Sequence, residues 1–222
     1  MFKLTPRSWM DVKHMGSVPF EEVTELKALC PTTKLKIHAG GREVELPRFQ
    51  RLYGQHSYRY SGIVLEAEPK IPRLVQRCLD WTRENYGEGW DGALVNWYNS
   101  GTQYIGKHSD DETDLVEGKP ILSFSFGQAR TFRIRNKRNP GDYRDMLTGH
   151  GMVIVMGGDM QKEYTHEITK TMKQVGSRVN ITVRAFKNPV ISKPVLSDSI
   201  VSDEPTDNQK RVKVTDEEVT SN

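Results

Sequence analysis

Short β-type runs follow one another from residue 92 to residue 186, and they limit the fold more than any other feature of the sequence. The runs are A-L-V-N-W-Y (93–98), I-L-S-F-S-F-G (121–127), T-F-R-I-R (131–135), M-V-I-V-M (152–156) and R-V-N-I-T-V-R-A-F (178–186), with Gly, Pro and Asn between them. A parallel βαβ arrangement needs a helix between consecutive strands, and no helical pattern separates these runs. The pattern therefore favours a sandwich or a jelly roll.

Two amphipathic helices are predicted before this region. Residues 19–30 begin with a proline and two acids and repeat apolar side chains at helical spacing. Residues 70–86 place Pro72 in the first turn and carry the same periodicity over a longer stretch. We expect this second helix to lie against the outside of the sheet, which makes the fold class mainly β (α+β).

Length and composition indicate one domain with an appendage. The 222 residues, 36% of them hydrophobic, are enough for one sizeable core over residues 1–188. Residues 189–222 are rich in Ser, Thr, Asp, Glu and Pro, contain no aromatic residue, and are predicted to be a disordered polar tail. This tail carries seven acidic and four basic residues, so the +3 net charge of the chain becomes +6 for the remainder. A mildly basic domain is compatible with a polyanionic partner.

Several other features limit the class of protein. Cys30 and Cys78 fall in the helical patterns and are expected to be small buried side chains rather than a disulfide. The N-terminus lacks a signal-peptide pattern, and no apolar run approaches ~18 residues. We therefore expect a soluble intracellular protein, in the nucleus or cytoplasm if the host is eukaryotic.

The best candidate for a metal site is a histidine and a carboxylate two residues apart. In an extended segment His108 and Asp110 point to the same side and can hold one ion, although about one such pair is expected by chance in this composition. His166 follows an apolar run and a glycine pair, and it can supply a third ligand from the mouth of a buried strand.

The last β-type run has an unusually polar face. Arg178, Asn180, Thr182 and Arg184 share one side, while the alternating aliphatic residues take the other. Buried guanidinium groups need anionic partners, and this strand supplies none. A dianionic ligand would satisfy them. The alternative is that both arginines face solvent.

Together these motifs resemble the AlkB family of iron(II)/2-oxoglutarate dioxygenases, which act in alkylation repair of DNA damage. The motifs are N-x-Y at Asn96 and Tyr98, H-x-D at His108 and Asp110, then His166, and R-x-N-x-x-x-R at Arg178, Asn180 and Arg184. The resemblance covers residues 47–186, roughly. It implies a double-stranded β-helix (jelly roll) core over about 92–186, supporting N-terminal helices, and a nucleotide-recognition hairpin or lid over about 34–62.

The resemblance also implies the cofactors and their ligands. His108, Asp110 and His166 would bind Fe(2+), and no catalytic residue is expected beyond the metal centre. Arg178 would pair with the distal carboxylate of 2-oxoglutarate and Arg184 would lie near its metal-bound carboxylate. Asn96, Tyr98 and Asn180 would form hydrogen bonds with this co-substrate. With O2, the enzyme would convert 2-oxoglutarate to succinate and carbon dioxide and release an N-methyl group as formaldehyde.

The region 47–62 is dense in arginine and tyrosine, with little core character, and resembles the nucleotide-recognition segment of the family. By this resemblance Tyr60 would stack on a flipped base opposite His108, with Tyr58 and Ser61 beside it. Asp111 and Glu112 would accept hydrogen bonds from the base. Trp97 departs from the family pattern, where relatives have a basic or smaller residue, and it leaves the pocket rim undefined.

Methylated DNA or RNA is the expected partner, with lesions of the 1-methyladenine and 3-methylcytosine type. The hairpin predicted over 34–48 has Ala39, Gly40 and Gly41 at its tip, where duplex-acting relatives carry a wedge residue, so single strands should be preferred. We expect a monomer without membrane contact. Three alternatives stay open: the same chemistry on an internal RNA methyl mark or a protein side chain, a structural zinc site, and a catalytically silent module that binds nucleic acid.

Overall fold

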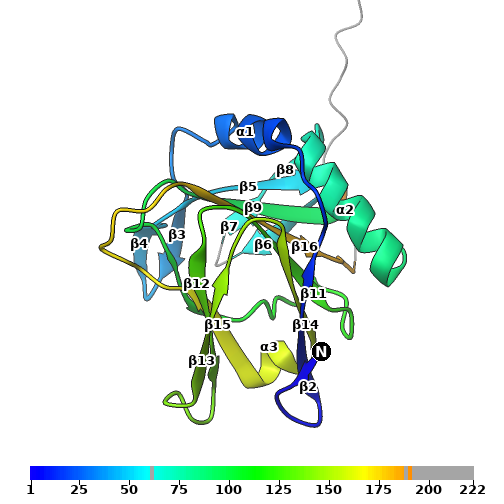
Figure 1. Cartoon of the computed structure of the whole chain (residues 1–222), viewed down its shortest axis with the longest axis vertical. Helices are drawn as coiled ribbons and strands as arrows, with labels where there is room; N and C mark the ends of the chain where they lie inside the picture. The colour runs from blue at the N-terminus through cyan, green and yellow to red at the C-terminus, as the bar shows by residue number, and fades with distance from the viewer. Residues whose placement is uncertain (61–62, 188–189, 192–222) are drawn as a thin grey trace, which may run out of the picture. The chain divides into compact units, whose positions relative to one another are not determined.

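The structure, a computed structural model, describes residues 1–60, 63–187 and 190–191 and is dominated by an eight-stranded sheet (Figure 1). Neighbouring strands are antiparallel except for the parallel pair β5–β8. In spatial order the strands are β1 (Phe2–Lys3), β2 (Ser8–His14), β14 (Met152–Gly158), β11 (Ile121–Gly127), β16 (Arg178–Arg184), β9 (Gly92–Tyr98), β5 (Phe49–Gly54) and β8 (Ala67–Glu68).

A four-stranded sheet faces the inner side of this large sheet and completes the jelly roll. Its strands are, in order, β10 (Ile105–His108), β15 (Tyr164–Ile168), β12 (Arg130–Asn136) and β13 (Tyr143–Thr148). Apolar side chains from both sheets, among them Met156 and Phe132, form one core between them. The serial antiparallel strands predicted from the sequence therefore build the predicted fold class.

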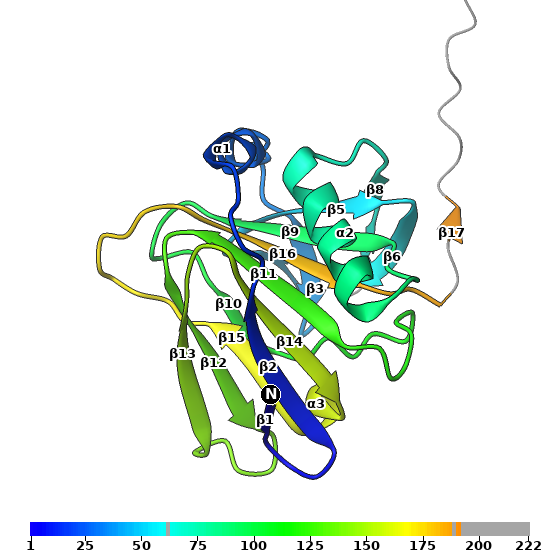
Figure 2. The same cartoon turned by 45° about the vertical axis from the view of Figure 1, so that its right-hand side comes forward.

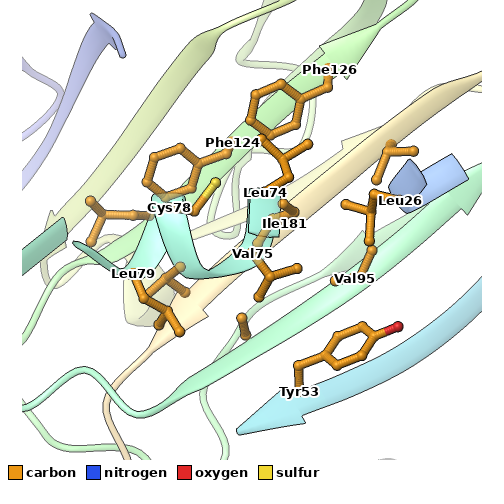
Figure 3. Close-up of a cluster of buried hydrophobic side chains, with 14 of the residues drawn as sticks. Leu26, Tyr53, Leu74, Val75, Cys78, Leu79, Val95, Phe124, Phe126 and Ile181 are labelled. Carbon is orange, nitrogen blue, oxygen red and sulfur yellow. The ribbon is translucent and has the colours of Figure 1, made fainter. Parts of the chain in front are cut away.

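Helices cover the outer side of the large sheet (Figure 2). They are α1 (Phe20–Ala28) and α2 (Arg73–Tyr86), both close to the predicted ranges, and Pro72 directly precedes α2. Leu74, Val75 and Leu79 of α2 are almost fully buried against strands β9, β11 and β16, as Figure 3 shows. Burial of each such side chain stabilises the fold by about 1.5–3 kcal/mol. Cys78 packs among them, and both cysteines are free, as predicted.

Trp97, which departs from the family pattern and left the pocket rim undefined in the sequence, belongs to this outer core and not to the rim. Its side chain is 1% exposed, and its indole nitrogen donates to the carbonyl of Leu26 in α1 at 2.8 Å. The reason is strand alternation: Asn96 and Tyr98 of β9 face inward, so the residue between them must face the helices.

Smaller strands form the region expected to recognise nucleotides. The hairpin of β3 (Lys36–Ala39) and β4 (Arg42–Glu45) turns at Gly40 and Gly41, whose φ angles of 59° and 74° suit the two-residue turn of a tight hairpin. A three-stranded sheet has the order β17 (Val190–Ile191), β6 (His56–Tyr60) and β7 (Ile63–Leu65). The short helix α3 (Met160–Glu163) precedes β15.

Two details differ from the sequence analysis. The region 47–62 has more core character than expected, because β5 lies within the large sheet and buries Leu52 and Tyr53. Residues 190–191, assigned to the tail, form β17, whereas 188–189 and 192–222 lie outside the described residues. No helix in the described part of the chain is long and apolar enough to span a membrane.

Candidate metal and co-substrate site

Two histidines face each other across paired strands of the small sheet. His108 is the last residue of β10, and the antiparallel register places it directly opposite His166 of β15. Their ring centroids are 4.2 Å apart. Asp110, two residues beyond β10, places one carboxylate oxygen 3.9 Å from Nε2 of His108 and the other 3.6 Å from Nε2 of His166. All three ligand atoms lie within 4.8 Å of one another, so one ion can contact them all.

The histidines are held in the form that binds a metal. Nδ1 of His108 lies 2.9 Å from the carbonyl of Gly106, and donation there leaves Nε2 as a free electron-pair donor toward Asp110. Phe132 stacks on the ring of His166 with centroids 5.4 Å apart. Burial lowers the pKa of His108, and burial together with His108 lowers the pKa of His166 to about 3. Both imidazoles are therefore neutral at neutral pH.

Asp110 is kept ionised by an arginine from the large sheet. Burial alone would raise the pKa of its carboxyl group, but Arg184, which donates to Oδ1, and the histidines outweigh burial and leave the pKa below its ordinary value. Arg184 is 4% exposed. Two neutral imidazoles and one carboxylate form the ligand set typical of non-haem iron(II) oxygenases.

Strand β16 places a second buried arginine deeper in the same cavity. Arg178 is 1% exposed, donates from Nη2 to the hydroxyl of Ser125 at 2.9 Å, and lies over the ring of Tyr98 at 5.1 Å. Its Nε and Nη1 have no hydrogen-bond partner among the described residues, and burial lowers its pKa to about 10. Buried, unsatisfied guanidinium donors require an anion, and a carboxylate of 2-oxoglutarate fits them. The alternative that Arg178 and Arg184 face solvent is wrong.

Asn96 and Asn180 line the cavity but already serve other protein groups. The side-chain oxygen of Asn96 accepts from Nε of Arg48 and Nε2 of Gln50, each at 2.8 Å. The amide nitrogen of Asn180 donates to the hydroxyl of Ser123 at 2.8 Å and to the backbone of β11. These contacts fix the orientation of both amides in the wall of the site.

Several residues of this wall were not predicted from the sequence. Ser123 and Ser125 alternate in I-L-S-F-S-F-G, and that alternation could have indicated that they face inward beside β16. Arg48 is 2% exposed and lines the cavity, whereas the sequence analysis placed it on a nucleic-acid surface. Its burial follows from the position of β5 inside the large sheet, which the arginine-rich sequence concealed.

The residues assigned to the base lie in different surroundings. Asp111 has a side chain 62% exposed and lies 3.7 Å from Nζ of Lys137. Glu112 is half-buried; burial raises its pKa, and its Oε2 has no hydrogen-bond partner among the described residues. Both line a second pocket that adjoins the triad at Asp110 and Arg184. Tyr58 and Tyr60 belong to β6, but their side chains, like all of Ser61, lie outside the described residues.

A structural zinc site fits this geometry poorly. Such sites usually have four protein ligands, often with thiolate. Among the residues that the structure describes, the only group of potential ligands is His108, Asp110 and His166. Cys78 is buried on the opposite side of the large sheet.

Comparisons with known proteins agree with this site. Residues 20–184 match the family model of the 2OG-Fe(II) oxygenase superfamily. The chain is 32% identical over 158 residues to DNA oxidative demethylase ALKBH2 of Mus musculus, covering 67% of this chain and 66% of that protein. It is 32% identical over 170 residues to alpha-ketoglutarate-dependent dioxygenase alkB homolog 3 of Homo sapiens, covering 72% of this chain and 59% of that protein. The chain thus spans less than two thirds of the length of either relative.

A solved structure shows the same fold. The structure of OsALKBH1 superimposes with a TM-score of 0.53 at 19% identity, covering 82% of this chain and 100% of that one. Residues 20–184, which the family model matches, contain the triad, both buried arginines and all strands of the two sheets except β1 and β2. This chain belongs to the AlkB family of the 2OG-Fe(II) oxygenase superfamily, whose members are iron(II)- and 2-oxoglutarate-dependent dioxygenases.

Proposed function

We propose that this protein oxidatively demethylates N-alkylated bases of the 1-methyladenine and 3-methylcytosine type in nucleic acid. The observation that carries the proposal is the buried triad beside Arg178, whose unsatisfied donors call for an anion. The names of the relatives, a DNA oxidative demethylase and an alkB homolog, support the choice of substrate.

The residues of the site have separate roles in the reaction. His108, Asp110 and His166 would hold iron(II), which when bound couples the oxidation of 2-oxoglutarate by O2 to hydroxylation of the N-methyl group. Arg178 binds the distal carboxylate of 2-oxoglutarate, and its contacts with Ser125 and Tyr98 fix the orientation of the guanidinium. Arg184 orients Asp110 and lies where it can also attract the second carboxylate of the co-substrate. The products are succinate, carbon dioxide, formaldehyde and the unmethylated base.

Base recognition would involve the second pocket. Glu112 has a carboxylate oxygen free to accept a hydrogen bond from an exocyclic amine of adenine or cytosine. Asp111 is more exposed and suits the rim. Tyr60 would stack on the base, with Tyr58 and Ser61 next to it in the recognition segment.

The first test removes the metal ligands one at a time. His108→Ala, Asp110→Ala and His166→Ala should each abolish demethylation, because a three-ligand site that loses a ligand binds iron weakly. Mass spectrometry of methylated DNA and RNA oligonucleotides after aerobic incubation with iron(II), 2-oxoglutarate and ascorbate measures the product, and an assay for succinate runs in parallel. His14→Ala, at an exposed histidine, is the control.

Several outcomes would redirect the proposal. Wild-type activity in any ligand variant would contradict the triad. Absence of succinate with the wild-type protein would favour a silent binding module. Succinate formation without loss of methyl groups from oligonucleotides would point to another substrate, such as a protein side chain.

A second test concerns single strands and duplexes. The tip of the β3–β4 hairpin is formed by two glycines, and ion pairs Lys36–Glu43 at 2.7 Å and Lys34–Glu45 at 3.3 Å neutralise charge along its sides. The glycine tip of this hairpin therefore offers no apolar side chain that could act as a wedge. Buried Trp97 cannot supply the wedge instead.

We expect single-turnover demethylation of a single-stranded oligonucleotide to be much faster than that of the same strand in a duplex, at one salt concentration. Unpairing a base costs a few kcal/mol that the hairpin cannot offset. Equal rates on the single strand and the duplex would contradict this prediction. A single Arg42→Phe substitution, which places an aromatic ring beside the glycine turn at an exposed strand position, is the matched variant and should narrow the difference between the two rates.

A further inference from the structure

Two of the three residues that follow β10 are hydrogen-bonded to one short segment on the N-terminal side of His166, and the third faces a lysine that is bonded to the same segment. We call residues 109–111, which include the ligand Asp110, the ligand loop. The hydroxyl of Ser109 donates to the carbonyl of Tyr164 at 2.9 Å. The backbone N–H of Asp110 donates to Oε1 of Gln161 at 3.0 Å. The third residue, Asp111, faces Lys137 across 3.7 Å.

Two of these ties meet at Gln161. Its side chain accepts from Asp110, and its backbone carbonyl accepts from Nζ of Lys137 at 2.8 Å. Its Nε2 lies 3.6 Å from the sulfur of Met156 on β14, which holds the amide in one orientation. Gln161 lies in α3, directly before the strand that carries His166.

The ligand loop needs such a tie for a physical reason. His108 and His166 are fixed by the backbone pairing of β10 and β15, but Asp110 lies beyond the end of β10. Without the Gln161 contact, its N–H would lose this partner, and only Arg184 and the Ser109–Tyr164 hydrogen bond would position its carboxylate. Contacts that hold the ligands in place before the ion arrives raise the affinity of a site for its metal.

We propose that Gln161 is a positioning residue for the metal centre, which fixes Asp110 relative to His166 through the backbone N–H of Asp110. This inference rests on the proposed function, because it assumes that the triad binds a divalent cation. Gln161 acts on the ion only through Asp110, although its side chain also lines the second pocket.

The test measures metal affinity rather than turnover. Purified full-length protein is titrated with cobalt(II), both by calorimetry and by the visible spectrum of the bound ion, with and without 2-oxoglutarate. Gln161→Met keeps the size of the side chain and removes the acceptor, so cobalt affinity should fall about 10–100-fold and the spectrum should change. The melting temperature of the metal-free protein should stay close to that of the wild type.

Two further variants separate positioning from general damage. Gln161→Glu keeps an acceptor at the same length and should restore most of the affinity. Gln174→Met makes the same substitution at an exposed position and should change nothing. If Gln161→Met does not fold, Ser109→Ala, which removes only one hydroxyl of the same set of ties, takes its place and should weaken cobalt binding several-fold.

The outcomes distinguish this inference from the proposed function. If wild-type protein and Gln161→Met bind cobalt equally, the positioning role is wrong while the metal centre stands. If the wild-type protein binds no cobalt, the metal centre itself is wrong. A fall in the melting temperature without a change in cobalt affinity would assign Gln161 a role in the fold alone.

Discussion

Arg178 is held in its position before any ligand arrives. Strand pairing places it opposite Tyr98 on one side and beside β11 on the other, so Ser125 and the ring of Tyr98 fix the guanidinium. The free-energy cost of burying this charge is incurred when the protein folds. A carboxylate that then binds the guanidinium forms a charge-assisted, bidentate interaction with it. Under the proposed function, this guanidinium would receive a carboxylate of 2-oxoglutarate rather than nucleic acid.

We expect Arg178→Ala to weaken 2-oxoglutarate binding by about 2–5 kcal/mol, the usual scale for truncating one partner of a buried pair. Arg178→Lys should recover only part of the lost binding free energy, because an ammonium group lacks the planar, two-pronged geometry of a guanidinium. Calorimetry with manganese(II) and 2-oxoglutarate measures this, and fluorescence anisotropy with a labelled oligonucleotide should show little change. Arg133→Ala, on the outer side of β12 where Arg133 pairs with Asp145, is the control. Equal losses for both ligands would place Arg178 on the nucleic-acid side.

At the scale of single residues, the sequence predicted those that lie on strands with regular alternation. Arg178 and Arg184 could be placed because aliphatic residues alternate with them, and the structure buries both. Arg48 could not be placed, since its burial depends on which strand lies next to β9. Gln161 could not be found either, because its contact with Asp110 links positions 51 residues apart through one side chain.

At the scale of elements, α2 and the serial strands were predictable, whereas the assembly of the recognition region was not. Helical periodicity and Pro72 define α2, and alternation defines β9, β11 and β16. Strand β5 was not predicted, because Gln50 and Arg51 interrupt the apolar pattern. The pairing of β17 with β6 joins residues more than a hundred positions apart, and a two-residue strand has no pattern of its own.

The β17–β6 pairing leads to a prediction about the C-terminus. A chain ending at Ile191 keeps β17, whereas a chain ending at Lys187 leaves β6, which carries Tyr58 and Tyr60 in its sequence, as an edge strand. We expect the shorter chain to bind single-stranded oligonucleotides several-fold more weakly and to bind 2-oxoglutarate normally. The longer chain should match the chain of 222 residues, because the composition of residues 192–222 offers little apolar surface. Anisotropy and calorimetry on all three chains check this, and identical results for the two truncations would show that β17 is dispensable.

At the scale of the whole molecule, the N-terminal residues are tied to the part of the fold that carries His166. Glu163, the last residue of α3, accepts hydrogen bonds from the hydroxyl of Ser8 at 2.5 Å and that of Thr5 at 2.6 Å. Arg7 donates to its other oxygen at 2.8 Å. Because β15 starts at the next residue, this cluster joins the edge of the large sheet to the small sheet near the metal ligands.

This cluster predicts a particular dependence of stability on pH. The hydrogen bonds from Ser8 and Thr5, and then Arg7, lower the pKa of Glu163 from 4.5 to about 2. A carboxyl group whose pKa is lower in the folded protein stabilises the fold fully above the unfolded value, and this contribution is lost as the pH falls through the folded value. Glu163→Gln should therefore have a lower melting temperature than the wild type at pH 7. The difference between the two melting temperatures should shrink between about pH 4.5 and pH 2, because residue 163 loses a charge in this range only in the wild type.

Thermal melts followed by circular dichroism from pH 7 to pH 2 measure both curves, with Glu84→Gln on the exposed side of α2 as the control. A difference that stays constant across this range would mean that Glu163 contributes through packing and neutral hydrogen bonds, and that its charge does not join the N-terminal segment to the small sheet.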